Sequence, residues 1–394
     1  MIIKQKIMRN VSLTAHPLGC AQDVQNQIAY VEQHPSPSAS LYPKRVLIVG
    51  GSTGYGLAAR IVAAIGAGSA TINVSVEREP SENKVATAGW YNTEAFEKEA
   101  TKRGLFARSL YADAFSDQTK EATADLIATH LGQVDLIIYS VASPLRTDPD
   151  TKEVYHSVIK PIGKTYSALS LDMQSGLIEQ ATIEPAQEDQ VEQTIKVMGG
   201  EDWQRWVEFL AKRNLLAENF ITVAFSYIGP QMTHPMYRDG TIGKAKEHLE
   251  ASAKKITALL QTIGGRALVS VNKAVVTRAS AVIPVVPLYI ALLYKVMKEQ
   301  ALHEECIEQM SRLFDQRLYG KKEIPLDKEG RIRLDDWEMK PQVQLEVQRR
   351  WKLQQEGKPL AEGDLDGFRR QYDHIHGFGF ESIDYEKDVD PTRI

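Results

Sequence analysis

Short apolar runs rich in β-branched residues alternate with segments of helical periodicity along most of the chain. Each run is bounded by glycine or polar residues, which is typical of strands that are buried on both faces of a sheet. Six such strands are expected, at Arg45–Val49, Thr71–Val76, Ala107–Leu110, Leu136–Ser140, Phe220–Ser226 and Ala267–Val271. Strands that alternate with helices in this way predict an α/β fold with a parallel sheet.

This alternation breaks between Ser143 and Glu201. Within that interval, Thr151–Ser167 and Leu169–Val197 alternate polar with apolar residues. Such a spacing places one set of side chains on each face of a half-buried strand. The pattern therefore predicts a β-rich insertion at about residues 143–200.

Helices are expected to return after the insertion. The first is predicted at Asp202–Leu215, and the chain after Pro284 has a helical pattern to about Leu318. The residues beyond Leu318 are mainly polar, and we expect a polar tail there. His374 and His376 lie in this tail; we expect them to serve a turn and not a metal site, because no further ligands stand at a usable spacing.

The composition narrows the class of protein. The 394 residues are 43% hydrophobic, enough for one extended domain over residues 1–394, and a net charge of −4 gives no support to a nucleic-acid partner. Cys20 and Cys306 have no metal-ligand or CxxC spacing, which fits a reducing compartment. The start of the chain lacks a signal-peptide core, and the longest uncharged stretch, Ala279–Tyr294, has 16 residues, fewer than the roughly 20 of a membrane span. We therefore expect a soluble cytoplasmic protein without stable membrane insertion.

The strongest chemical signal is a glycine-rich turn after the first expected strand. Gly50, Gly54 and Gly56 follow a G-xxx-G-x-G pattern, and a helix is expected to start at Gly56. Glycine permits positive φ and lets backbone N–H groups approach a pyrophosphate, and the helix adds its positive end. A tight turn without a ligand is the alternative, but the strand–turn–helix context favours a dinucleotide site.

Acidic and small residues follow the next strands. Glu77 lies 21 residues after Gly56, near the roughly 20 expected for a carboxylate that accepts hydrogen bonds from ribose hydroxyls. Because a carboxylate repels a 2′-phosphate, Glu77 favours NADH over NADPH, although Arg78 could instead bind that phosphate. After the third and fourth strands come Asp113-Ala114, where an acid can accept from the adenine amino group, and Val141-Ala142, small enough to let a cofactor lie against the sheet edge.

A tyrosine and a lysine suited to reductase chemistry follow the fifth strand. A phenol can hydrogen-bond a substrate oxygen, and a nearby ammonium is expected to lower the pKa of that phenol and to hold the cofactor ribose. Tyr237 is the candidate phenol, with Tyr227 as a second candidate facing the same cleft. Thr241 is the expected N-cap of the next helix, so that helix starts after Tyr237. Helical phase then leaves both Lys244 and Lys246 open as the ammonium.

Together these segments resemble the FabV-type trans-2-enoyl-CoA and enoyl-acyl-carrier-protein reductases. The resemblance rests on Gly50–Gly56, on Glu77 and on Tyr237–Lys246, which has a Tyr-x8-Lys spacing. It extends to Thr14–Cys20 near the start and to Gly377–Phe380 near the end, and so covers nearly the whole chain. It implies a monomeric, elongated relative of the short-chain dehydrogenases. In such a protein, a Rossmann-type doubly wound parallel sheet carries a substrate-binding lobe made of the insertion and a helical extension.

The resemblance also implies roles for individual residues. Tyr237 would be the catalytic acid, Tyr227 would contact the substrate, and Lys246 rather than Lys244 would be the lysine that holds the cofactor. The residues that would line NADH are Gly50, Gly51, Ser52, Thr53, Gly54, Tyr55, Val76, Glu77, Asp113, Ala114, Val141, Ala142, Lys246, Val275, Val276 and Thr277.

The implied activity is the NADH-dependent reduction of the 2,3 double bond of a trans-2-enoyl thioester in fatty acid synthesis, with the acyl group carried by coenzyme A or by acyl carrier protein. A hydride would reach the β carbon while Tyr237 donates to the carbonyl oxygen and Lys246 orients the ribose. The alternatives are a ketone or aldehyde reductase on the same scaffold and a non-catalytic dinucleotide sensor. The apolar region at about residues 279–318, beginning with Ala279–Tyr294, would line an acyl tunnel or form a lid; a plain core helix is the alternative.

Overall fold

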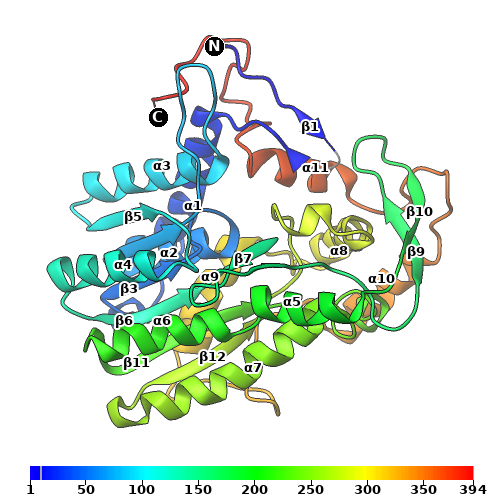
Figure 1. The fold of residues 1–394 in the computed structure, drawn as a ribbon. Helices are drawn as coiled ribbons and strands as arrows, with labels where there is room; N and C mark the ends of the chain where they lie inside the picture. The colour runs from blue at the N-terminus through cyan, green and yellow to red at the C-terminus, as the bar shows by residue number, and fades with distance from the viewer. Residues whose placement is uncertain (9–10, 394) are drawn as a thin grey trace.

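A parallel sheet of seven strands crosses the molecule (Figure 1), in a computed structural model that describes residues 1–8 and 11–393. Its order is β13-β12-β11-β6-β3-β4-β5, and every neighbouring pair is parallel. The strands are β3 (Arg45–Val49), β4 (Ala70–Ser75), β5 (Ala107–Tyr111), β6 (Val134–Tyr139), β11 (Leu216–Ser226), β12 (Arg266–Val271) and β13 (Ile332–Arg333). All six expected strands are present, β3 with the expected bounds and the other five with shifted ends, so the α/β prediction is confirmed. The seventh strand, β13, lies in the segment expected to be a polar tail.

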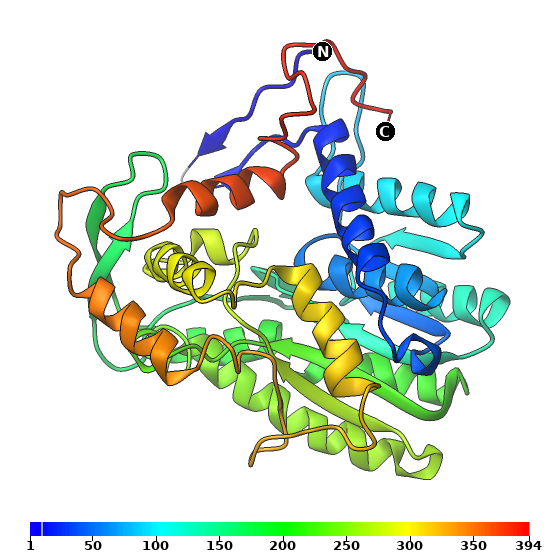
Figure 2. The ribbon, with the colours of Figure 1, turned by 180° about the vertical axis from the view of Figure 1, so that it is seen from behind.

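Helices cover both faces of this sheet, as the view from behind also shows (Figure 2). Along β3, Val46 and Ile48 pack against one helical layer, and Leu47 and Val49 pack against the other. This alternation follows from the two-residue period of a strand. The first layer contains α1 (Pro17–Gln33), α2 (Gly54–Ala67), α3 (Ala88–Lys102) and α9 (Cys306–Arg312); the second contains α4 (Asp117–His130), α6 (Glu201–Lys212) and α7 (Thr241–Leu259).

The insertion contains two antiparallel hairpins, which confirms its β-rich character. Its hairpins are β7 (Leu145–Thr147) with β8 (Val154–His156), and β9 (Tyr166–Leu171) with β10 (Ile178–Ile183). The prediction of further strand up to Val197 is wrong, because Glu188–Met198 is helix α5. Its apolar residues Val191, Ile195 and Met198 recur at helical spacing, and a capping box fixes its start.

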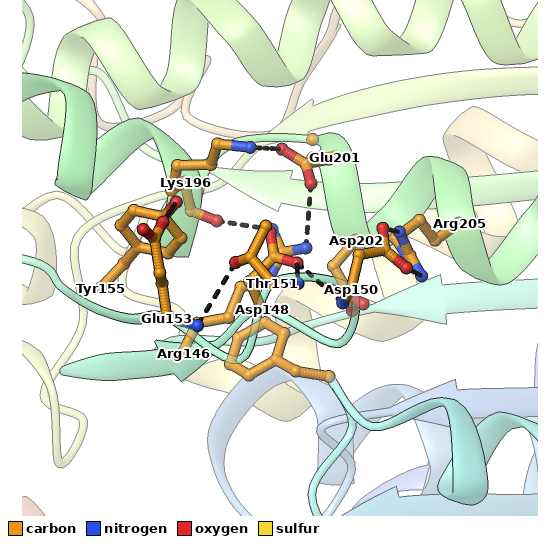
Figure 3. A network of polar contacts seen from close by, with 12 residues as sticks. Arg146, Asp148, Asp150, Thr151, Glu153, Tyr155, Lys196, Glu201, Asp202 and Arg205 are labelled. Carbon is orange, nitrogen blue, oxygen red and sulfur yellow. Dashed lines mark hydrogen bonds and ion pairs between the residues drawn. The ribbon is translucent and has the colours of Figure 1, made fainter.

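A network of polar contacts joins the β7–β8 hairpin to helices α5 and α6 (Figure 3). Arg146 is fully buried; it donates to the Lys196 carbonyl oxygen at 2.7 Å and to the Glu201 carboxylate at 3.0 Å. Its guanidinium also lies over the Phe115 ring. A buried guanidinium is tolerated when such partners compensate for lost hydration. The network therefore ties β7 to the end of α5 and the start of α6.

The C-terminal third folds into a second apolar cluster and is not a polar tail. The long helical region breaks between Gln300 and Glu305 into α8 (Val286–Glu299) and α9, which runs into a π-helix at Leu313–Leu318. Beyond it lie α10 (Pro341–Trp351) and α11 (Leu365–His374). We call α8, α10, α11 and the β9–β10 hairpin the second lobe, since they share one cluster of buried residues. Each of α10 and α11 buries only a few apolar residues, and for this reason their sequences look polar.

The two ends of the chain meet on one side of the molecule (Figure 1). A short hairpin, β1 (Ile7–Met8) with β2 (Val11–Ser12), precedes α1, and the Met1 amino group donates to the Val389 carbonyl oxygen at 2.6 Å. His374 stacks on Phe380, and His376 hydrogen-bonds to the Tyr372 carbonyl oxygen. Within residues 1–8 and 11–393, none of the helices combines the length and the apolarity that a membrane span needs.

Candidate active site

The glycine turn joins β3 to α2 at the carboxyl edge of the sheet. Gly50 has a φ of +91°, and a Cβ added there would lie 2.2 Å from the Ser140 carbonyl oxygen after β6. A Cβ on Gly56 would lie 2.1 Å from the Gly50 carbonyl oxygen. Helix α2 begins at Gly54, two residues earlier than expected. The turn lies between β6 and β4, where the strand order reverses, which is the usual place for a dinucleotide in a doubly wound sheet.

Glu77 lies against this turn. Its carboxylate accepts from the Ser52 hydroxyl at 2.6 Å, and its side chain is 5% exposed. The guanidinium of Arg78 donates instead to the Val85 carbonyl oxygen, whereas Arg278 lies 3.8 Å from the carboxylate. Sequence reasoning missed Arg278, because no local motif links it to a residue 201 positions earlier.

Buried side chains of α4 and α6 fix the backbone of the Asp113-Ala114 turn after β5. The Ala114 carbonyl oxygen accepts from the Lys120 ammonium and the Trp206 indole, both at 3.0 Å. Lys120 is itself buried in an ion pair with Asp202 at 2.8 Å. These contacts leave the Asp113 side chain exposed above a fixed backbone. Val76 is also exposed after β4, and Val141-Ala142 follows β6 at the same sheet edge.

The loop after β12 returns to the glycine turn. The Tyr55 hydroxyl donates to the Lys273 carbonyl oxygen at 2.6 Å, and the Thr277 methyl group would lie 3.7 Å from a Cβ on Gly54. Val275 and Val276 are buried beside it. The structure thus brings the expected cofactor residues of the first and last parts of the sheet together.

Tyr237 and Tyr227 meet beside the carboxyl end of β11. Their rings make an edge-to-face contact with centroids 4.8 Å apart. Helix α7 starts after Tyr237, as expected, but its N-cap is Gly240 and not Thr241. The Thr241 hydroxyl instead donates to the Val158 carbonyl oxygen of the insertion.

The two candidate lysines lie in different surroundings. Lys244 is half-exposed and pairs with Glu247 at 3.0 Å. Lys246 donates to the Phe225 carbonyl oxygen, next to the strand end that carries Tyr227, at 3.1 Å. Burial lowers the pKa of Lys246 to about 8.

The expected lowering of the tyrosine pKa is wrong for this structure. Burial raises the pKa of Tyr237, and the negative charge of Glu338 raises it further; Lys246 is not among the causes. The Lys246 ammonium is hydrogen-bonded to the Phe225 carbonyl oxygen instead. Tyr237 is therefore a neutral phenol at neutral pH and can donate its proton in a hydrogen bond.

Two further residues reach this site, Tyr289 from the second lobe and Glu338 from the segment between β13 and α10, and sequence reasoning missed both. Glu338 is fully buried and accepts from the Tyr227 hydroxyl at 3.2 Å and from the Tyr289 hydroxyl at 2.6 Å.

Most of α8 belongs to the core, since Leu288 and Ile290 are completely buried. The start of α8 and the residues before it line a hollow of about 210 Å³ with the β9–β10 hairpin. Its lining residues are Ser170, Leu171, Asp172, Glu179, Ala281, Ile283, Pro284 and Pro287.

Three family models of known proteins together match nearly the whole chain. Residues 84–319 match the family model for the trans-2-enoyl-CoA reductase catalytic region, and residues 2–82 match that for the NAD(P)H binding domain of trans-2-enoyl-CoA reductase. Residues 326–389 match a model described as the enoyl reductase FAD binding domain.

Individual relatives cover the same length. The NADH-dependent enoyl-acyl-carrier-protein reductase of Flavobacterium johnsoniae is 52% identical over 389 residues, which are 99% of this chain and 98% of the relative. The NADH-dependent trans-2-enoyl-CoA reductase of Ruminiclostridium cellulolyticum is 50% identical over 390 residues, with the same coverage. The crystal structure of Treponema denticola trans-2-enoyl-CoA reductase in complex with NAD superposes with a TM-score of 0.95, at 47% identity over 99% of this chain and 98% of that one. The chain belongs to the trans-2-enoyl-CoA reductase family.

Proposed function

We propose that this protein is an NADH-dependent reductase of the 2,3 double bond of trans-2-enoyl thioesters in fatty acid synthesis. The observation that carries the proposal is a neutral, buried phenol, Tyr237, beside the same sheet edge as a glycine turn that leaves no room for side chains. The expected fold and the family membership support the same activity.

The residues present fit a dinucleotide. The close approach of Gly50 and Gly56 to neighbouring backbone allows no side chain at either position, as a turn that holds a pyrophosphate requires. Glu77, kept beside the turn by Ser52, is suited to accept from ribose hydroxyls and disfavours a 2′-phosphate. When bound, NADH would supply the hydride that is added to the β carbon, and a proton from solvent, taken up at the α carbon, completes the reduction. Asp113-Ala114, Val76, Val141-Ala142 and Val275-Val276-Thr277 line the rest of the proposed site.

The chain's own contribution is to position the thioester and stabilise its developing charge. Tyr237 donates a hydrogen bond to the thioester oxygen, where negative charge accumulates in the transition state. Lys246, rather than Lys244, holds the nicotinamide ribose beside Phe225 near the carboxyl end of β11 and so fixes its orientation. Tyr227 completes the wall against which the thioester rests.

We also propose that the protein is a cytoplasmic monomer in which residues 1–394 form one extended domain. The second lobe and the region at about residues 279–318 bind the acyl chain, which coenzyme A or acyl carrier protein delivers. Light scattering of purified protein at several concentrations tests the monomer: a mass that rises above 44.0 kDa would contradict it.

The activity is tested by following NADH oxidation with crotonyl-CoA, longer trans-2-enoyl-CoA thioesters and acetoacetyl-CoA, each repeated with NADPH. We expect rapid oxidation with the enoyl thioesters and NADH only. Faster oxidation with acetoacetyl-CoA would indicate a carbonyl reductase, and NADH binding without turnover of any thioester would indicate a sensor.

A further inference from the structure

A buried carboxylate joins three parts of the molecule behind the two tyrosines. Glu338 lies between β13 and α10 and has no exposed surface. Its Oε1 atom accepts from Tyr227 at 3.2 Å and from Tyr289 of α8 at 2.6 Å. Its Oε2 atom accepts from the Ala274 N–H at 2.8 Å, in the loop that leads to the proposed cofactor residues. One side chain thus links the end of β11, the second lobe and the loop after β12.

The number of protons available in this cluster limits what Tyr227 can do. The Tyr289 hydroxyl accepts from the Gln344 amide at 3.1 Å, so its own single proton goes to Glu338. An ionised carboxylate only accepts, and the Tyr227 proton is then also held by Glu338. A protonated Glu338 can instead donate to the Tyr227 oxygen, which leaves the Tyr227 proton free to point elsewhere.

Both protonation states of Glu338 are accessible near neutral pH. Burial raises the pKa of Glu338 to about 7, against the opposing effects of the hydrogen bonds from Tyr289 and Ala274 and of the Lys273 ammonium. The titratable and charged groups that face it are Tyr227, Tyr237, Tyr289, Tyr55, Lys273 and Asp335.

We propose that Glu338 is a positioning residue whose protonation decides whether Tyr227 can donate a second hydrogen bond to the thioester oxygen beside Tyr237. This inference rests on the proposed function, because it concerns the same oxyanion. In the protonated state of Glu338, two phenols stabilise the developing charge. In the ionised state, Tyr227 is turned toward Glu338 and Tyr237 acts alone.

The expected signature is a fall in kcat as Glu338 ionises. Losing an oxyanion donor outright costs about 10²–10³ in turnover, and a donor that is only diverted should cost less, roughly tenfold. The KM for NADH should stay constant, since the Glu338 carboxylate hydrogen-bonds to Tyr227, Tyr289 and the Ala274 N–H, which are not among the proposed cofactor residues.

The decisive measurement is kcat between pH 5.5 and 9.5 for the wild type and for Glu338→Gln. The glutamine oxygen can accept from the Ala274 N–H while the glutamine amide group donates to Tyr227. The variant should therefore keep, at alkaline pH, the kcat that the wild type has at acid pH. Lys246 titrates in both proteins; the ratio of their kcat values therefore isolates Glu338. A wild-type alkaline fall that persists unchanged in Glu338→Gln overturns the proposal.

Two further variants guard against a folding defect. The kcat of Tyr227→Phe divided by that of Glu338→Gln should not change with pH. At every pH, this ratio should equal the one that the wild type reaches at alkaline pH. Glu346→Gln is the matched control, since Arg349 and Arg350 lower the pKa of that partly exposed glutamate to about 2 and it should not alter the profile. A Tyr227→Phe enzyme that still shows the transition near pH 7 contradicts the role of Tyr227.

An infrared titration separates this inference from the proposed function. A protonated-carboxyl band that disappears as the pH rises through about 7, shifts in Tyr227→Phe and is missing in Glu338→Gln would support the proton exchange even in a protein that reduced no enoyl thioester. Without such a band the exchange is refuted, whatever the activity. A band that titrates while kcat does not follow refutes the positioning role.

Discussion

The cofactor edge of the sheet and the second lobe build their sites in different ways. At the glycine turn, backbone groups form the surface, and Gly50 and Gly56 work by having no side chain. On the side of the second lobe, hydroxyl groups form the site, and Tyr227 and Tyr289 meet at Glu338 from distant segments. A site made of backbone should be sensitive to added atoms. A site made of phenols should be sensitive to the loss of a single oxygen and to pH.

The largest expected effect comes from removing one oxygen from the phenol site. Tyr237→Phe should lower kcat by about 10²–10³, as for the loss of an oxyanion donor, and should leave NADH affinity unchanged. Steady-state kinetics and a fluorescence titration with NADH measure the two quantities. Wild-type turnover in this variant would remove Tyr237 from the mechanism.

Adding one carbon at the glycine turn should damage cofactor binding instead. Gly50→Ala forces a Cβ to within 2.2 Å of the Ser140 carbonyl oxygen at a φ of +91°. Strain of about 1–3 kcal/mol should weaken NADH binding by roughly fivefold to a hundredfold. Gly104→Ala is the control, because its φ is also positive but no atom lies within 4 Å of the added Cβ. Equal effects of the two substitutions on NADH affinity would contradict a backbone-built site.

Lys244 and Lys246 of α7 should differ in their effect on cofactor use. Lys246→Met should lower kcat/KM for NADH about tenfold, because the ribose loses the group that orients it. Lys244→Met changes an exposed side chain that pairs only with Glu247, and its kinetics should match the wild type. A larger defect in the Lys244 variant would reverse the assignment.

The smallest effect should be on the choice between cofactors. Glu77→Ala removes the carboxylate and leaves Arg278, 3.8 Å from it, able to face a 2′-phosphate. The ratio of NADPH to NADH activity should rise about fivefold, since the half-exposed Arg278 guanidinium contributes roughly 1 kcal/mol toward a 2′-phosphate. The ratio of kcat/KM values measures it, and Arg78→Ala should leave the ratio unchanged because Arg78 donates to Val85.

The cofactor edge could be predicted from sequence because its signals are local. Arg45–Val49 was expected with the bounds that β3 has, and the glycine turn follows it directly. A strand buried on both faces has a continuous apolar run, and a turn without Cβ atoms needs glycine, so each residue carries its own signal.

The second lobe could not be predicted in the same way. Val343 with Val347 in α10, and Phe368 with Tyr372 in α11, are apolar pairs one turn apart in otherwise polar segments, and their partner α8 is far away in sequence. Glu338 has no local motif at all. Its function depends on Tyr227 and Tyr289, which are 111 and 49 residues away.

Tracing a deuteride from NADH into the product tests the central claim most directly. With NADH labelled at one C4 position and then at the other, the wild type is expected to place deuterium at the β carbon of butyryl-CoA from crotonyl-CoA for one label only. Nuclear magnetic resonance of the product locates the deuterium. Deuterium at the α carbon, or at C1 of an aldehyde or alcohol released from the thioester, would contradict hydride addition to the β carbon at this site.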